Sequence, residues 1–177
     1  MKRSVCGLSG AALLLVACGG QEGEAPAASD STSTAAPAGA AAAAPIDVTV
    51  EQLRALRWIE GTWRGSGVDQ PTFYERYTFI DDSTIRAESS PDSTFPNAED
   101  VGAIVLRDGR VTTGDDVTMQ WAVTAIDARS VRFDPVRGAR NTFVWTSESD
   151  SAWTARLSWT DRDGVPHEQV YQMRRMP

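Results

Sequence analysis

Side chains that could carry out covalent or acid–base chemistry are few in this 177-residue chain. His167 is the only histidine and no serine occupies a Gly-x-Ser-x-Gly turn, so a Ser-His-Asp triad is not indicated. Adjacent carboxylates occur at Asp81-Asp82 and Asp115-Asp116, and glycoside hydrolases use paired acids. Each pair lies where a turn is expected, and aspartate is favoured in turns because it hydrogen-bonds the local backbone. We therefore predict neither a catalytic site nor a metal site.

The two cysteines lie near the beginning of the chain, where a basic start is followed by an apolar stretch. The run Leu15-Val16-Ala17-Cys18 closes that stretch, and this order resembles the signal peptide and lipobox of bacterial lipoproteins. The resemblance implies cleavage before Cys18 and attachment of lipid to its thiol and its new amino terminus. Residues 1–17 are therefore expected to be a signal peptide. Cys6 leaves with it, so the folded part has no thiol for a disulfide or a metal.

The same segment predicts where the protein resides. Its apolar stretch, Val5 to Ala17, is shorter than the ~20 residues that a membrane-spanning helix needs. Acyl chains on Cys18 would hold the protein at the membrane instead, since each buried CH₂ contributes about 0.8 kcal/mol. In lipoproteins an aspartate after the cysteine favours the inner membrane, whereas Gly19 follows here. We expect a cell-envelope protein, lipid-anchored in the outer membrane and facing the periplasm.

Residues 18–45 contain the lipidated cysteine and a tether rich in Ala, Pro, Ser and Thr. The tether has no large apolar side chain, so burial cannot offset its conformational entropy, and we expect a disordered spacer. The whole chain has a formal net charge of −7. Non-specific nucleic-acid binding needs clustered cations, so we expect no nucleic-acid partner.

Residues 46–177 have the pattern of one all-β domain that begins with a short helix. Thr49 and Gln52 have the spacing of a capping box, and Gly61 is expected to end the helix. The apolar positions of the helix are Leu53, Leu56 and Ile59. Apolar and polar residues then alternate in runs such as Phe73 to Phe79 and Trp153 to Trp159, separated by turn signals. About ten strands result, and their sequential hairpins favour an antiparallel up-and-down β-barrel over a sandwich.

The heptapeptide Gly61-Thr62-Trp63-Arg64-Gly65-Ser66-Gly67 opens the first predicted strand. It resembles the GxWxGxG signature of nitrobindin-like barrels, within the calycin group of lipocalins and fatty-acid-binding proteins. The resemblance implies a calycin-like barrel over roughly residues 50–177. The alternate glycines remove side chains from one strand face, which lets another element approach, and Trp63 can plug the barrel end beneath the helix. We interpret the heptapeptide as a packing motif.

Aromatic residues on the predicted strands are the candidates for ligand contact: Trp63, Phe73, Trp121, Trp153 and Tyr171. A barrel of about ten strands is wider than its side chains fill, which favours a cavity for a small hydrophobic or amphipathic ligand. In a small or flattened barrel the same residues form a filled core, and the sequence leaves both possibilities open. Four arginines also fall inside strands, and an inward one could pair with a ligand carboxylate: Arg76, Arg86, Arg132 and Arg156.

The resemblance carries a second functional hypothesis, which concerns His167. In nitrobindin-like proteins a histidine on the last strand is the axial ligand of haem iron, and His167 opens the last predicted strand. This implies a haem protein acting on nitrogen oxides or peroxynitrite. The residues after it, Glu168-Gln169-Val170, depart from the family's pattern, and a hydrogen-bonded turn histidine is the other interpretation. A structural or accessory envelope lipoprotein is a third hypothesis. Our main expectation is non-covalent ligand binding without a cofactor.

Overall fold

The computed structural model describes residues 43–177, apart from residues 97 and 115–117. The predicted signal peptide, Cys18 and nearly all of the tether lie outside the described residues, and so does the pair Asp115-Asp116. Within the described part of the chain, no helix has the length and apolar character needed to cross a bilayer.

A short helix opens the domain, as the sequence predicts. It consists of α-helix α1 (Val50–Arg54) and 3₁₀-helix η1 (Ala55–Ile59). The capping box is present: Gln52 N donates to Thr49 Oγ1 over 3.2 Å, and Thr49 N donates to Gln52 Oε1 over 2.8 Å. The second half differs from the α-helix expected. The buried positions recur every three residues, which is the period of a 3₁₀ helix, so the tighter winding keeps them on one side.

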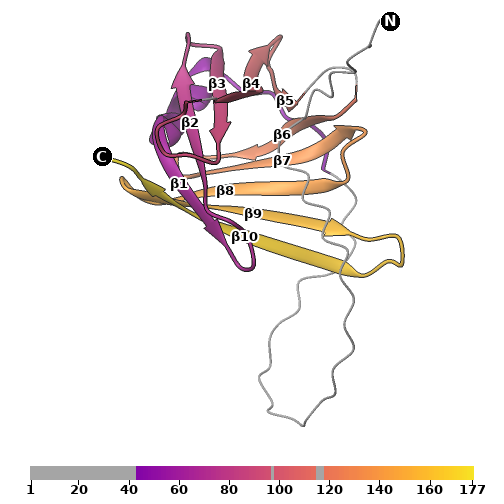
Figure 1. Cartoon of the computed structure of the whole chain (residues 1–177). Coiled ribbons are helices and arrows are strands. Elements are labelled where there is room, and N and C mark those ends of the chain that lie inside the picture. Colours follow the sequence, from indigo (N-terminus) through magenta and orange to yellow (C-terminus); the bar gives the residue numbers. More distant parts are fainter. Residues whose placement is uncertain (1–42, 97, 115–117) are drawn as a thin grey trace, which may run out of the picture. The chain divides into compact units, whose positions relative to one another are not determined.

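Ten antiparallel strands follow the helix and close into a barrel (Figure 1). They are β1 (Gly61–Gly67), β2 (Phe73–Phe79), β3 (Thr84–Ser90), β4 (Glu99–Arg107), β5 (Arg110–Gly114), β6 (Gln120–Ile126), β7 (Ser130–Arg137), β8 (Asn141–Ser149), β9 (Ala152–Thr160) and β10 (Pro166–Arg175). Each strand pairs with its neighbours in the sequence, and β1 pairs with β10 to complete the ring. The predicted fold class, a ten-stranded up-and-down barrel after one helix, is confirmed.

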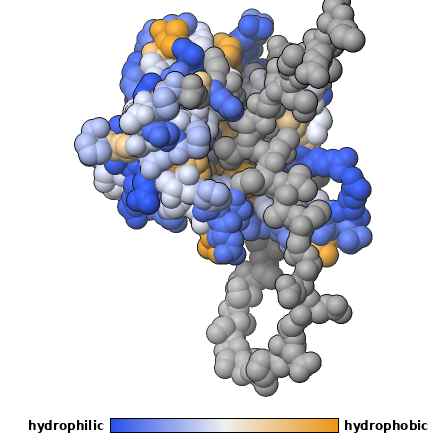
Figure 2. All heavy atoms as spheres, viewed as in Figure 1, coloured by the Kyte–Doolittle hydropathy of each residue, from blue (hydrophilic) through white to orange (hydrophobic). Residues whose placement is uncertain are grey.

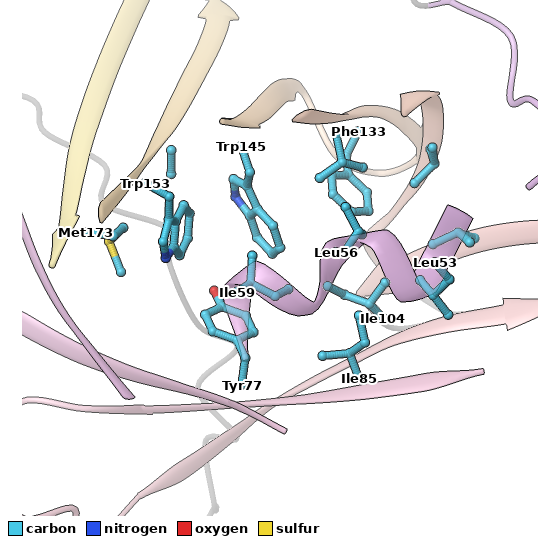
Figure 3. Close-up of a cluster of buried hydrophobic side chains, with 14 of the residues drawn as sticks. Leu53, Leu56, Ile59, Tyr77, Ile85, Ile104, Phe133, Trp145, Trp153 and Met173 are labelled. Atoms are coloured by element: carbon cyan, nitrogen blue, oxygen red, sulfur yellow. The ribbon is translucent and has the colours of Figure 1, made fainter. Parts of the chain in front are cut away.

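The helix closes one end of the barrel, which we call the helix end. Leu53, Leu56 and Ile59 are fully buried in the core. In Figure 3, Ile59 lies among core side chains that come from strands on different sides of the barrel, Tyr77 and Trp153 among them. Arg54 fixes the helix to the turn after β2, with its Nη2 atom 2.6 Å from Asp82 Oδ2.

The opposite end, which we call the far end, includes the loops at residues 68–72, 91–96, 138–140 and 161–165 among those that the structure describes. Here the β9–β10 hairpin projects past β1, because β1 pairs only with residues 171–175 of β10. In Figure 1, β8, β9 and β10 are long ribbons that lie side by side. Side chains on the projecting residues 166–170 thus have no β1 wall beside them.

The glycines of the first strand serve packing, as interpreted from the sequence. A Cβ atom on Gly65 would lie 2.2 Å from Phe73 Cζ. One on Gly67 would lie 2.8 Å from Gln169 Nε2 and 3.0 Å from Tyr171 Cδ1. The space that the two glycines leave free is therefore filled by side chains of β2 and β10.

The outer face of the barrel is largely hydrophilic in the view of Figure 2. The four strand arginines considered above as partners for a ligand carboxylate each lie within 4 Å of a carboxylate on the outer side of the barrel: Arg76 and Arg86 near Glu88, Arg132 near Asp134, and Arg156 near Glu168. They consequently face solvent and acidic neighbours, and none of these four offers its charge to the barrel interior.

A candidate ligand site inside the barrel

Apolar side chains fill the barrel interior and also line its two ends. Fully buried side chains fill the space beneath the helix, and partly buried apolar side chains pack against this core at both ends: Ile46, Trp58, Phe79, Leu106 and Ile126 at the helix end, and Phe73, Trp121, Phe143 and Leu157 toward the far end. Two edge-to-face ring pairs line this half, Phe73 with Tyr171 at 5.4 Å and Trp121 with Phe143 at 5.7 Å between centroids. These four rings therefore form the aromatic lining of the far half of the interior.

The structure separates the five predicted contact residues into two groups. Trp63 and Trp153 belong to the filled core at the helix end, with ring centroids 6.0 Å apart. Trp63 Nε1 donates to Ile59 O over 2.6 Å, so this side chain plugs the barrel beneath the helix as expected. Phe73, Trp121 and Tyr171 lie toward the far end. Contact of these residues with a ligand stays a prediction.

A buried carboxyl group is the most unusual feature of the interior. Glu75 lies on β2 directly opposite Trp63 of β1, and only 8% of its surface is exposed. Its Oε2 atom accepts a 2.7 Å hydrogen bond from the hydroxyl of Tyr77, which lies on the same strand face. Among the described residues, Oε1 has no hydrogen-bond donor and no cationic side chain pairs with the group. A buried carboxyl group with a single hydrogen bond is costly, which marks Glu75 as a candidate functional group.

The environment of Glu75 shifts three pKa values upward. Burial raises the pKa of Glu75 from 4.5 to about 7, although the hydrogen bond from Tyr77 opposes that rise. Burial, together with the charge of Glu75, raises the pKa of Tyr77 well above its ordinary value. The same two causes raise the pKa of Tyr171, which places Tyr171 within electrostatic reach of the carboxyl group. Both phenols remain neutral over the range in which Glu75 titrates.

Because of Glu75, the stability of the protein is expected to fall as the pH rises from about 4.5 to about 7. In this range the carboxyl group is ionised in the unfolded chain but stays protonated in the barrel, so unfolding releases a proton. Below the range both states are protonated and the contribution is complete; above it both are ionised and the contribution is lost. The shift from 4.5 to about 7 corresponds to about 3 kcal/mol.

The measurement is urea unfolding of the full chain and of Glu75→Gln between pH 4.5 and pH 8. The difference in unfolding free energy between the two proteins should change by about 3 kcal/mol across this range. Glu148→Gln is the control, because Glu148 is an exposed residue of β8 and should leave the slope unchanged. Parallel curves for the wild type and Glu75→Gln would mean that the carboxyl group is solvated.

Glu75 was not among the residues singled out in the sequence, although a signal was present. In the run Phe73 to Phe79, residues 73, 75, 77 and 79 share one strand face, and the other three are aromatic. An acid at such an inward position is the pattern of a buried carboxyl group. By contrast, the pair Asp81-Asp82 has the turn role expected, since Asp81 Oδ1 accepts hydrogen bonds from the backbone and hydroxyl of Ser83.

His167 lies on the part of β10 that projects past β1. Its Nε2 atom is 2.7 Å from Asp161 Oδ2, and its ring stacks on Trp159 with centroids 5.4 Å apart. The hydrogen bond with His167 is the main cause that lowers the pKa of Asp161. The His167 side chain is 41% exposed. These are the surroundings of a hydrogen-bonded histidine beside a turn.

These surroundings do not fit an axial haem ligand. Such a ligand needs a free ring nitrogen facing an apolar pocket that holds the porphyrin. Here the Nε2 atom is bonded to Asp161, and the ring lies exposed at the rim instead of within the aromatic interior, so Nδ1 does not face an apolar pocket either. Haem ligation by His167 stays a prediction without support from the described residues, and we derive no chemistry through haem.

The fold and the interior define a class: a closed antiparallel β-barrel of ten strands with a short helix at one end and a buried acid among aromatic rings. No protein-family model matches the chain, and the search of curated proteins found no relative.

Solved structures with low similarity include a protein of unknown function from the DUF3598 family of Nostoc punctiforme PCC 73102 (12% identity, TM-score 0.47, 76% of this chain and 51% of that one). A redesigned β-barrel aligns with 16% identity and a TM-score of 0.36, over 70% of this chain and 96% of that one. The chain spans about half the length of the Nostoc protein. These likenesses concern the barrel fold alone.

Proposed function

We propose that this protein is a calycin-like barrel that binds a small hydrophobic or amphipathic molecule, non-covalently, through its far end. The observation that carries the proposal is the group of partly buried aromatic side chains at the far end. The helix covers one end of the barrel, and partly buried rings such as Phe73 and Trp121 line the other end. Partly exposed aromatic side chains inside a barrel mouth are typical of sites for apolar ligands.

Fluorescence titration with N-phenyl-1-naphthylamine, a neutral apolar fluorophore, tests this proposal. We expect saturable binding to the full chain with a stoichiometry of one. Trp121→Ala should weaken the affinity at least tenfold, because Trp121 packs edge-to-face with Phe143 at the far end. Ile80→Ala is the control, since Ile80 is 57% exposed beside the turn at the helix end. Absence of saturable binding would favour a structural or accessory role.

We further propose that the barrel is lipid-anchored at Cys18 in the cell envelope, in the outer membrane facing the periplasm. The support is the lipobox-like run that ends at Cys18 and the glycine that follows it. Cys18→Ser is expected to move the protein from the membrane fraction to the soluble fraction, because lipid can no longer be attached. The near-UV circular dichroism of the released protein should match that of the wild type. Continued membrane retention of Cys18→Ser would contradict the single-anchor proposal.

A further inference from the structure

We propose that Glu75 is the polar contact for the molecule bound inside the barrel, and that this molecule carries a protonated amine. The inference rests on the proposed function and deepens it by naming the chemical class of the ligand. Glu75 accepts one hydrogen bond, from Tyr77 to Oε2, and no described residue donates to Oε1, so this oxygen is left as an acceptor for a ligand.

Aromatic rings surround Glu75 and favour a cation over a neutral donor. Trp63 lies directly across from it on β1, Tyr77 is hydrogen-bonded to it, and Tyr171 is close enough for its pKa to respond. Phe73 precedes Glu75 on the same strand face and packs on Tyr171. The negative ring faces attract an ammonium group, and this attraction strengthens where water is excluded. One acid within a set of aromatic rings is therefore suited to an alkylammonium head group.

The arrangement of charges also argues against an acidic ligand. Arg76, Arg86, Arg132 and Arg156 have acidic partners on the outer side of the barrel, so they do not neutralise a carboxylate inside. The titratable groups that face Glu75 are Tyr77 from its own strand and Tyr171 from β10, both neutral near pH 7. A bound anion would meet the Glu75 carboxylate without a compensating charge, whereas an amine supplies one.

The position of Glu75 along the barrel suits an amphipathic amine. Along β2 from the far end, Phe73 comes first, then Glu75, then Tyr77. An ammonium group at Glu75 would place an attached alkyl chain beside the half-buried rings of the far end. The polar head would thus lie deep and the apolar tail would point toward the mouth.

The test is displacement of N-phenyl-1-naphthylamine from the full chain at pH 7.5 by decylamine, decanol and decanoate. We expect decylamine to displace the fluorophore at a concentration at least tenfold lower than decanol, and decanoate to be weakest. In Glu75→Gln the preference for decylamine over decanol should disappear, while the affinity for the fluorophore is kept. Glutamine removes a charge that burial disfavours, so this variant is expected to fold.

Glu88→Gln is the matched control, because it removes one carboxylate from the outer face of the neighbouring strand. It should keep the preference for decylamine, which separates recognition at Glu75 from attraction by the net charge of −7. Equal displacement by all three amphiphiles, or a preference that persists in Glu75→Gln, would overturn the inference and leave the proposed function standing. Failure of the fluorophore itself to bind would overturn both.

Discussion

Replacing Asp134 with alanine is expected to lower the free energy of unfolding by about 4 kcal/mol, because the residue is a buried charge with four hydrogen bonds. Asp134 lies on β7 and is 1% exposed. Arg132 donates to both of its carboxylate oxygens, each over 2.8 Å. The hydroxyl of Thr142 on β8 donates over 2.6 Å, and that of Thr124 on β6 donates as well. The carboxylate therefore joins three strands, and alanine leaves their donors without an acceptor.

Equilibrium urea unfolding of the full chain measures this effect. The control is Asp150→Asn, in an exposed turn, which should change the free energy by less than about 0.5 kcal/mol. A loss in Asp134→Ala as small as the control's would mean that solvent satisfies these donors equally well.

Asp134 is expected to make the folded protein less stable at low pH, which is the opposite of the pH dependence expected from Glu75. Burial raises the pKa of Asp134, but the hydrogen bonds from Arg132, Thr124 and Thr142 and the charge of Arg132 outweigh it, so the net pKa lies below 3.8. The stability that the ionised carboxylate contributes is complete at pH values above its ordinary pKa. This stability is lost as the pH falls through the lowered pKa of the folded state. In Asp134→Asn the part of the acid-induced loss of stability that comes from this carboxylate should be absent.

The strand pattern of the barrel could be predicted because alternation is a local property. The run Phe73 to Phe79 coincides with β2, and His167 lies at the start of β10 as expected. The capping box at Thr49 could be predicted for the same reason, since both of its hydrogen bonds join residues that are three positions apart. In such cases the residue spacing alone determines which groups can meet.

The cluster around Asp134 could not be predicted, because it depends on an irregularity in the sheet. The pairing of β6 with β7 shifts register between Val123 and Ala125, which leaves Thr124 as an extra residue in the strand. Such a bulge re-aims its side chain, and here the Thr124 hydroxyl reaches Asp134. Strict alternation contains no signal for the shift.

The position of His167 shows a second limit of alternation. Its parity matches that of Tyr171 and Met173, which are buried in the interior. His167 is nevertheless exposed, because β10 is longer than the β1 strand beside it and the hairpin projects beyond the wall. Alternation along a strand shows on which face a residue lies. Burial also requires a neighbouring strand of matching length, and the sequence of β10 alone does not give the length of β1.

The second large effect is expected at Trp63, where replacement with alanine should cost about 4 kcal/mol of unfolding free energy. Trp63 is completely buried and packs beneath η1 at the helix end of the barrel. Its removal would empty the space beneath η1, delete the hydrogen bond to Ile59 O, and remove the ring on which the Arg175 guanidinium lies at 4.3 Å. Trp63→Phe keeps most of the ring volume and should lose about half as much.

The measurement for Trp63 is urea unfolding followed by far-UV circular dichroism, because the substitution itself changes the tryptophan fluorescence. Trp159→Ala is the matched control: Trp159 is 37% exposed on the projecting hairpin and should cost less than about 1 kcal/mol. Equal losses in the two variants would mean that Trp63 does not seal the barrel. A large loss at Trp63 alone would show that packing beneath the helix supplies a large part of the stability of the barrel, because this ring joins the helix to the core at that end.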